Sequence, residues 1–213
     1  MRTKSFFTAM AVALAVSTSA SAQDKTLNFY VGASALGSVK TNMSYEKGVK
    51  NKLSWTPSIG AQLGMEKRLG VVSTLTEFEF ATHKYKKHNF SYMERFNPDE
   101  FDKLSTFSLS LYAGKTIGSG RFQVPLYVGA GFDYLKGYPM HNVTGHLAAK
   151  ARVKYYVTTK LGIYAGATFK YGFGAKGVNR SMSSDDFKKN DPTYNIAYVP
   201  LMLEAGLTFT VGK

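Results

Sequence analysis

The sequence predicts an all-β protein that folds as a closed antiparallel up-and-down β-barrel of eight strands. Eight segments alternate apolar and polar residues with a period of two, which is typical of strands whose two faces meet different surroundings. The connections between these segments alternate between short and long. The apolar faces carry most of their aromatic residues near their two ends.

The chain begins with a segment that is typical of a cleavable signal peptide, residues 1–22. Two basic residues near its start precede an apolar run, Phe6–Val16, which is too short to span a membrane as a helix. The small residues Ala20-Ser21-Ala22 then form a cleavage site. We therefore expect the mature chain to begin at Gln23 and residues 23–213 to form one barrel domain.

Each predicted strand is long enough to cross a bilayer as a tilted strand, which needs about 9–11 residues. The eight strands are expected at Leu27–Val39, Leu53–Glu66, Val71–His83, Ser105–Thr116, Arg121–Leu135, His146–Thr158, Lys160–Gly172 and Ala197–Val211.

Short connections follow the even-numbered strands and long polar connections follow the odd-numbered ones. The short ones lie near Lys67–Gly70, Ile117–Gly120 and Thr158-Thr159. The long ones are Lys40–Lys52, Lys84–Leu104, Lys136–Gly145 and Phe173–Ile196. This asymmetry is the pattern of outer-membrane barrels, which have short periplasmic turns and long extracellular loops. It places both chain termini on the periplasmic side.

The position of the aromatic residues favours an apolar face that meets lipid. Two aromatic girdles around an aliphatic belt match the two interfaces of a membrane. The outer girdle is expected to contain Trp55, Phe78, Phe80, Phe107, Phe132, Tyr134, Phe169 and Tyr171. The periplasmic girdle is expected to contain Phe29, Phe122, Tyr155 and Phe209. A soluble lipocalin-like barrel, with its apolar face inward, gives no reason for this sorting.

The opposite faces of the strands carry charged residues, which predicts a charged lumen. The expected lumen network is Glu66, Glu77, Glu79, Asp133, Lys150, Arg152, Lys154, Lys170 and Glu204. Its five acids and four bases nearly balance, as buried charges in a narrow lumen require. By the same phase argument, His83 and His146 point inward near the outer rim. The alternative is a solvated face of a soluble sheet.

In strand number, loop asymmetry and its terminal strand Val199–Val211, the mature chain resembles the small eight-stranded outer-membrane barrels. These are the relatives of the OmpA transmembrane domain and of OmpX, often grouped as porin-family proteins. The resemblance implies an outer-membrane location and contact with the outer-membrane assembly machinery. The chain departs from many of these proteins because it does not end in an aromatic residue, and Phe209 is the substitute we expect.

The function that we expect is a structural or surface-interaction role in adhesion or envelope integrity. Eight strands leave an interior that side chains can fill, so that a wide pore is not expected. A narrow channel or transport accessory is the first alternative, and a lipid-A-modifying enzyme is the second. No catalytic, cofactor or metal motif is found in the sequence, and an enzyme is not the expected class.

The expected partners are outer-membrane lipid and lipopolysaccharide, and an extracellular molecule bound through the loops. Candidate contacts with their anionic groups are Lys47, Lys50, Lys52, Lys84, Lys86 and Lys87. The basic excess of the chain does not indicate a nucleic-acid ligand, because an exported protein seldom meets one and the lysines are spread through polar segments. We expect a monomer.

Overall fold

The computed structural model describes residues 26–44, 51–69, 72–88, 103–137, 140–173, 193–195 and 201–211. Within these ranges, the side chains of 40–44, 51–53, 69, 87–88, 140–142 and 193–195 are not described. The predicted signal peptide and the predicted mature start at Gln23 lie outside the described residues. Among the residues described, no helix is long and apolar enough to cross a membrane.

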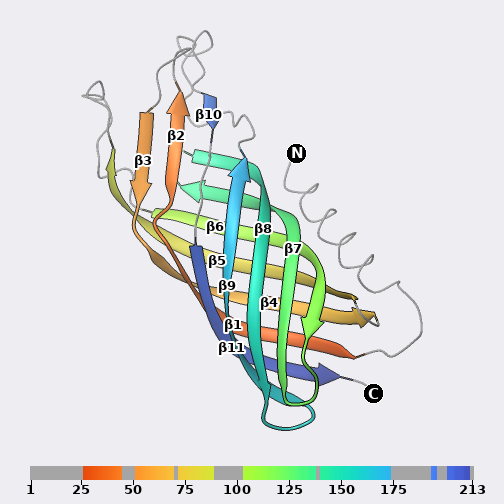
Figure 1. The fold of residues 1–213 in the computed structure, drawn as a ribbon. Helices are drawn as coiled ribbons and strands as arrows, with labels where there is room; N and C mark the ends of the chain where they lie inside the picture. Colours follow the sequence, from red (N-terminus) through yellow and green to blue (C-terminus); the bar gives the residue numbers. More distant parts are fainter. Residues whose placement is uncertain are drawn as a thin grey trace.

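Eight antiparallel strands close into a barrel, which confirms the predicted fold class (Figure 1). The strands are β1 (Leu27–Leu36), β4 (Ser58–Leu69), β5 (Val72–His88), β6 (Lys103–Ile117), β7 (Phe122–Gly137), β8 (Met140–Tyr156), β9 (Leu161–Phe173) and β11 (Leu201–Val211). Around the barrel they follow the order β5-β4-β1-β11-β9-β8-β7-β6, and β6 pairs again with β5.

The barrel has a turn end and a loop end. The turn end carries the first residue of β1, the last residue of β11 and three short connections. In the connection between β6 and β7, Gly118 and Gly120 have φ values of 84° and 67°, which a residue with a side chain rarely adopts. The opposite, loop end carries the connections that leave β1, β5, β7 and β9.

Three short strands extend the sheet beyond the loop end of the barrel (Figure 1). They are β2 (Lys40–Ser44), β3 (Asn51–Trp55) and β10 (Thr193–Asn195). β2 pairs with β3 and β10, and β3 pairs with the distal part of β5. The predicted second strand, Leu53–Glu66, is therefore wrong in its first part, because Thr56 and Pro57 separate β3 from β4. Proline lacks the N–H that a strand ladder needs.

The strands also run further at the loop end than predicted. β5 continues to His88, and β7 and β8 continue to Gly137 and Met140, with only residues 138–139 between them. The long loop predicted at Lys136–Gly145 is therefore mostly a β-hairpin. The outward residues at these strand ends are charged, as at Lys84, Lys86 and Lys136, so the apolar alternation that marks a strand fades there although the backbone pairing continues.

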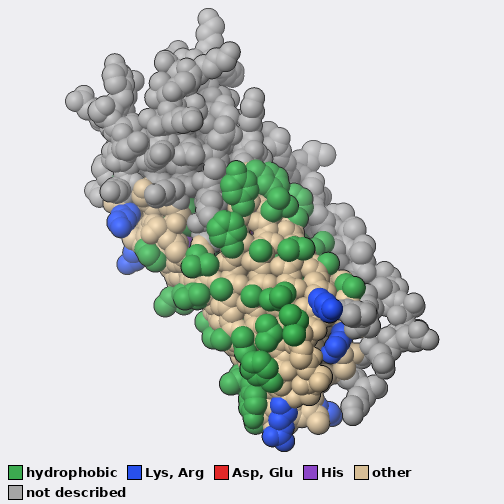
Figure 2. Space-filling view, in the orientation of Figure 1, with side chains coloured by type: hydrophobic (Ala, Val, Ile, Leu, Met, Phe, Trp, Pro, Cys, Tyr) green, Lys and Arg blue, Asp and Glu red, His purple; other side chains and the backbone are tan. Residues whose placement is uncertain are grey.

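The two faces of the barrel have the predicted orientation. The outward side chains of Val128 and Leu203 are 68% and 57% exposed, whereas the inward side chain of Arg152 is 1% exposed. Along β11 the exposed and buried positions alternate almost without interruption. Figure 2 shows the outward face as a band of hydrophobic side chains between basic residues. Apolar groups face out and ionic groups face in, the reverse of a soluble barrel.

Glycines make room for one tyrosine that lies along the inner wall. Tyr164 on β9 is the register partner of Gly206 on β11, which in turn is paired with Gly32 on β1. A Cβ atom at Gly32 would lie 2.3 Å from the Tyr164 hydroxyl, and one at Gly206 would lie 2.9 Å from Cε1 of that ring. The pair of glycines is therefore required by the close approach of the Tyr164 side chain to the two neighbouring strands.

Trp55 differs from its prediction. It was placed in the lipid-facing outer girdle, but its side chain is completely buried. Its ring packs against Tyr85 with centroids 5.9 Å apart at an interplanar angle of 80°. The cause is the break at Thr56 and Pro57, together with a register shift between Ser54 and Trp55. The period-two count cannot be carried across such a break.

Because Trp55 is the only tryptophan, its fluorescence tests this correction. We expect that its emission, in protein reconstituted into vesicles, is not quenched by lipids with brominated acyl chains. A Phe132→Trp substitution in a Trp55→Phe background should be quenched strongly, because Phe132 is 56% exposed on the outward face. Strong quenching of the native Trp55 would contradict its burial.

Candidate functional site

The structure places all nine predicted lumen residues inside the barrel, each with a side chain that is almost fully excluded from solvent. They are Glu66, Glu77, Glu79, Asp133, Lys150, Arg152, Lys154, Lys170 and Glu204, none more than 4% exposed. They sort into three groups along the barrel axis. A buried charge is costly unless it is paired and hydrogen-bonded, so the partners of each group decide whether the interior is stable.

The middle group joins β8 to two other strands across the lumen. Lys150 and Arg152 on β8 both contact Glu77 on β5 and Glu204 on β11. The Lys150 Nζ to Glu204 Oε2 distance is 2.9 Å. Arg152 donates through Nε to Glu204 and through Nη2 to Glu77. Each carboxylate thus meets both cations, and the group is electrically balanced.

Two tyrosine rings enclose the Arg152 guanidinium. Its Cζ atom lies 4.9 Å from the centroid of Tyr30 and 4.7 Å from that of Tyr164. The two rings meet edge to face, with centroids 5.4 Å apart. Cation–π contacts of this kind are strongest where water is excluded. The electron-rich ring faces stabilise the buried positive charge of Arg152. Its Nη1 has no hydrogen-bond partner among the described groups.

The turn end is closed by a group centred on Glu66. Tyr127 donates to Glu66 Oε1 over 2.6 Å, and Asn28 donates to Oε2 over 3.2 Å. Lys154 and the Tyr30 hydroxyl also contact Oε2. A buried carboxylate with this many donors is well compensated. The predicted network did not include the tyrosines. Tyr127 and Tyr164 nevertheless have the same strand phase as Asp133 and Lys170, so their inward position can be predicted from the sequence.

Towards the loop end, Lys170 contacts Glu79 at 3.3 Å, and a serine, a histidine and an aspartate form a hydrogen-bonded chain. His146 Nδ1 lies 2.7 Å from Asp133 Oδ2, and His146 Nε2 lies 2.9 Å from Ser110 Oγ. Ser108 donates to the other Asp133 oxygen. An ionised carboxylate only accepts, so Nδ1 donates to Asp133 and Nε2 can accept from Ser110. All these side chains are buried.

Apolar residues and His83 cover the loop end of the lumen. The buried apolar side chains are Leu36, Val39, Trp55, Leu104 and Leu135. His83 is also fully buried, and its Nδ1 lies 2.9 Å from the Thr56 carbonyl oxygen. A small cavity beneath this layer, bounded also by Glu79 and Lys170, has room for about one water molecule. The charged side chains described in the lumen are thus covered at this end by a buried layer.

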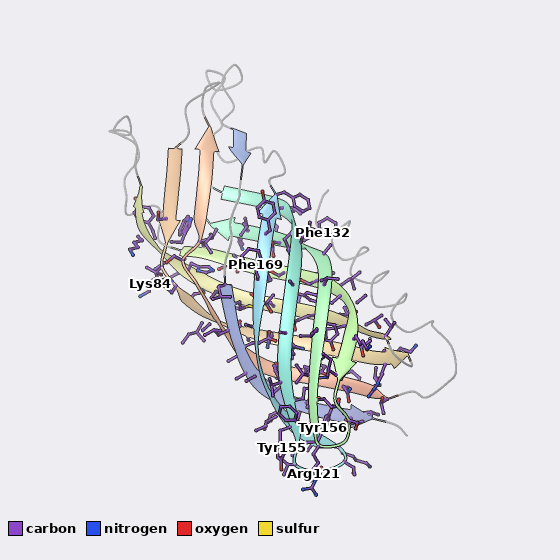
Figure 3. All side chains as sticks on the ribbon, in the orientation of Figure 1. Lys84, Arg121, Phe132, Tyr155, Tyr156 and Phe169 are labelled. Carbon is purple, nitrogen blue, oxygen red and sulfur yellow. The ribbon has the colours of Figure 1, made fainter. Side chains whose placement is uncertain are left out.

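Eleven of the twelve predicted girdle residues lie on the outward face, and Trp55 is the exception described above. Eight are exposed: Phe29, Phe80, Phe122, Phe132, Tyr155, Phe169, Tyr171 and Phe209. Phe78, Phe107 and Tyr134 are half-buried beneath neighbouring side chains. Figure 3 shows Phe132 and Phe169 towards the loop end, and Tyr155 close to Arg121 at the turn end.

The predicted loop lysines are only partly described. Lys84, labelled in Figure 3, is exposed on the distal part of β5 rather than in a loop. Lys86 is exposed on the same part of β5. The side chains of Lys47, Lys50, Lys52 and Lys87 lie outside the described part of the structure. Within the described residues, no group of three or more His, Asp or Glu side chains is placed to hold a metal ion.

Comparison with known proteins identifies a family and a fold. The family described as "Domain of unknown function (DUF2715)" matches residues 5–211. None of the curated proteins matches the sequence. Among solved structures, the chain is similar to Neisserial surface protein A (NspA), with a TM-score of 0.50 and 14% identity over 85% of this chain and 96% of that one.

Two further solved structures are less similar. The outer membrane protease OmpT of Escherichia coli has a TM-score of 0.43 and 10% identity, over 89% of this chain and 99% of its own. Ail, the attachment invasion locus protein of Yersinia pestis, has a TM-score of 0.43 and 14% identity, over 88% of this chain and 100% of its own. The likeness to NspA supports the closed barrel fold, and at this identity it shows the fold alone.

The middle charge group generates a stability prediction. Arg152→Met should destabilise the barrel by about 3–5 kcal/mol, because it leaves two buried carboxylates with one cation. Adding Glu204→Gln should recover part of this loss, since Glu77 and Lys150 then form a balanced pair. The urea midpoint of unfolding, followed as the gel shift between folded and boiled protein, measures both changes. Equal midpoints for Arg152→Met and wild type would contradict the analysis.

Proposed function

Because the chain belongs to the DUF2715 family, a family of unknown function, we propose a role for it from its geometry: a sealed outer-membrane barrel that supports a surface-interaction or envelope-integrity function. The observation that carries the proposal is the combination of an apolar exterior with an interior closed by ion pairs. The exterior suits a bilayer, and the interior does not suit a pore. What remains available for specific contacts is the loop end.

The dimensions of the apolar band support a membrane location. Phe122 and Phe132 lie ten residues apart on the outward face of β7. At about 3.3 Å per residue and a tilt of about 40°, they are separated by roughly 25 Å along the barrel axis, the height of a lipid-facing band. The described acids all point inward, so none of them needs to be placed in hydrocarbon.

The export route belongs to the same proposal. A signal peptide over residues 1–22 would deliver the chain across the inner membrane, with Gln23 as the mature N-terminus, which N-terminal sequencing of the membrane form checks. The assembly machinery would then recognise the terminal strand, with Phe209 in place of a final aromatic residue. A specific relation to the OmpA and OmpX barrels rests on strand number and loop asymmetry.

The extension at the loop end provides a scaffold for recognition. β2, β3, β10 and the distal part of β5 continue the sheet past the closed barrel (Figure 1). Loops that are held on a rigid sheet carry recognition in many proteins. We therefore place the extracellular partner at this extension, and the monomeric barrel beneath it serves as its anchor in the membrane.

The sealed interior predicts the result of a conductance measurement. Wild-type protein in planar bilayers should give no long-lived open level, because Arg152, Lys150 and the two carboxylates cross the lumen. A steady conductance that is abolished by Arg152→Met would instead favour the narrow-channel alternative. A porin measured in the same bilayers provides the positive control.

One observation favours an enzymatic alternative. The Asp133–His146–Ser110 chain has the hydrogen-bond order of a serine hydrolase, with aspartate orienting histidine and histidine facing serine. A lipid-A-modifying enzyme would need its reactive side chains on the lipid face of the barrel, whereas these three residues lie in the lumen. They are also buried, and the neighbouring cavity admits about one water molecule. We infer that the three hydrogen-bonded residues Asp133, His146 and Ser110 have a structural role.

A serine-reactive probe separates these two roles. We expect a fluorophosphonate to leave the folded protein unlabelled, and Ser110→Ala to lower the urea midpoint of unfolding by an amount equivalent to about 1–3 kcal/mol, because a buried partner of His146 is removed. Labelling of the folded protein that is lost in both Ser110→Ala and His146→Ala would overturn the structural role. The Ser105→Ala variant, changed on the outward face of the same strand, is the matched control.

A further inference from the structure

The described barrel keeps its acidic side chains in the lumen, whereas its basic side chains lie both inside and outside. Every acidic side chain that the structure describes is one of the five in the lumen. At the outward and rim positions described, all the charged residues are basic, and they lie at both ends of the barrel. Figure 2 shows blue but no red groups on the visible face. At the turn end they are Lys67, Arg68, Lys115, Arg121 and Lys160, and at the loop end Lys84, Lys86, Lys103 and Lys136.

The loop-end lysines are gathered on three neighbouring strands. Lys84 on β5 is the direct register partner of Lys103 on β6. Lys136 on β7 is the register partner of Ser105, two residues along β6 from Lys103. Lys86 lies two residues beyond Lys84 on β5, and all four of these lysines are exposed. Like charges directly opposite one another destabilise an antiparallel pair. We call Lys84, Lys86, Lys103 and Lys136 the rim lysines.

The rows beneath the rim lysines have the layering of a membrane interface. Phe80, Phe107 and Tyr134 form one cross-strand row. The ring centroids of Phe80 and Phe107 are 4.8 Å apart, and those of Phe107 and Tyr134 are 6.2 Å apart. Above it lies a hydroxyl pair, Thr82 and Ser105, at 3.4 Å. The order from the apolar band outward is therefore aromatic, hydroxyl, cation. Aromatic rings settle at the headgroup level, and lysines just beyond them meet the phosphates.

The apolar surface beneath the rim lysines continues onto β8. Val143, the register partner of Tyr134, is exposed and apolar. The described cations of the loop end, on β5, β6 and β7, therefore lie directly beyond a row of aromatic and aliphatic side chains. Cations placed over an apolar surface suit a ligand that has both anionic groups and acyl chains.

We propose that the rim lysines and the aromatic row of Phe80, Phe107 and Tyr134 form a binding site for a phosphate-bearing lipid of the outer leaflet. The phosphate groups lie between the lysines, and the acyl chains lie along the aromatic row. The aromatic surface directly below the cations favours a lipid over a soluble polyanion, since a polyanion has no apolar part to cover it. This inference rests on the proposed membrane location.

The test uses the full mature chain refolded in a maltoside detergent, and native mass spectrometry counts the bound lipid. Bis-phosphorylated lipid A is the probe, and the same lipid after enzymatic dephosphorylation is its control. The Lys84→Gln/Lys103→Gln/Lys136→Gln variant should bind the probe roughly a hundredfold more weakly, because each lysine near an anionic surface contributes about 1 kcal/mol. Binding by the wild type should also weaken at high salt.

A charge-matched variant, Lys115→Gln/Arg121→Gln/Lys160→Gln, removes three cations at the turn end and should retain wild-type affinity. Equal affinity of wild type and the rim variant, or equal binding of the dephosphorylated lipid, would overturn the site. If inorganic phosphate or a sulfated polysaccharide displaced the bound lipid at equal charge concentration, the ligand of the site would be a soluble anion, and the lipid proposal would be overturned.

Failure of the membrane location is recognised separately. In that case the refolded chain would not insert into phosphatidylcholine vesicles and would show no gel shift between unheated and boiled samples, and both proposals would fall together. Insertion with a normal gel shift, but without phosphate-dependent binding, would overturn only the lipid site.

Discussion

The bridge that Arg152 and Lys150 make to Glu77 and Glu204 is the interaction on which the rest of the barrel depends. It ties β8 to β5 and β11 through the lumen, in addition to the backbone pairing around the wall. A closed sheet turns every second side chain inward, and a lumen of eight strands must be filled by them. With charges as the filling, each must find its counter-charge there, because water is excluded.

This constraint explains why small and aromatic residues share the inward face. Tyrosines bring hydroxyl donors and ring faces to the buried ions, as Tyr127 does for Glu66 and Tyr164 does for Arg152. Glycines on the neighbouring strands leave the space that these rings occupy, as Gly32 and Gly206 do beside Tyr164. The inward composition of Tyr, Gly and paired ions is thus one solution to filling a narrow polar cylinder, whereas the outward face only has to be apolar.

The period of two predicted from the sequence both the barrel and the inward position of all nine charges, since strand phase alone decides the face. Strand phase does not decide which residues meet across the lumen, because that depends on register and stagger around the whole barrel. The Asp133–His146–Ser110 chain and the role of Tyr30 were missed for this reason. Trp55 was misplaced because phase is lost at a break. The extra strands were missed because short, largely polar segments such as Lys40–Ser44 carry no apolar alternation.

The dual pairing of β5 has a mechanical consequence. Its distal part holds β3, while its proximal part lies between β4 and β6 and carries Glu77 and Glu79 into the lumen. A pull on the β2–β3 hairpin by a bound partner therefore loads a continuous backbone that ends among the buried ion pairs. Such a force on the distal part of β5 would be resisted by the ion pairs that Glu77 and Glu79 form inside the barrel.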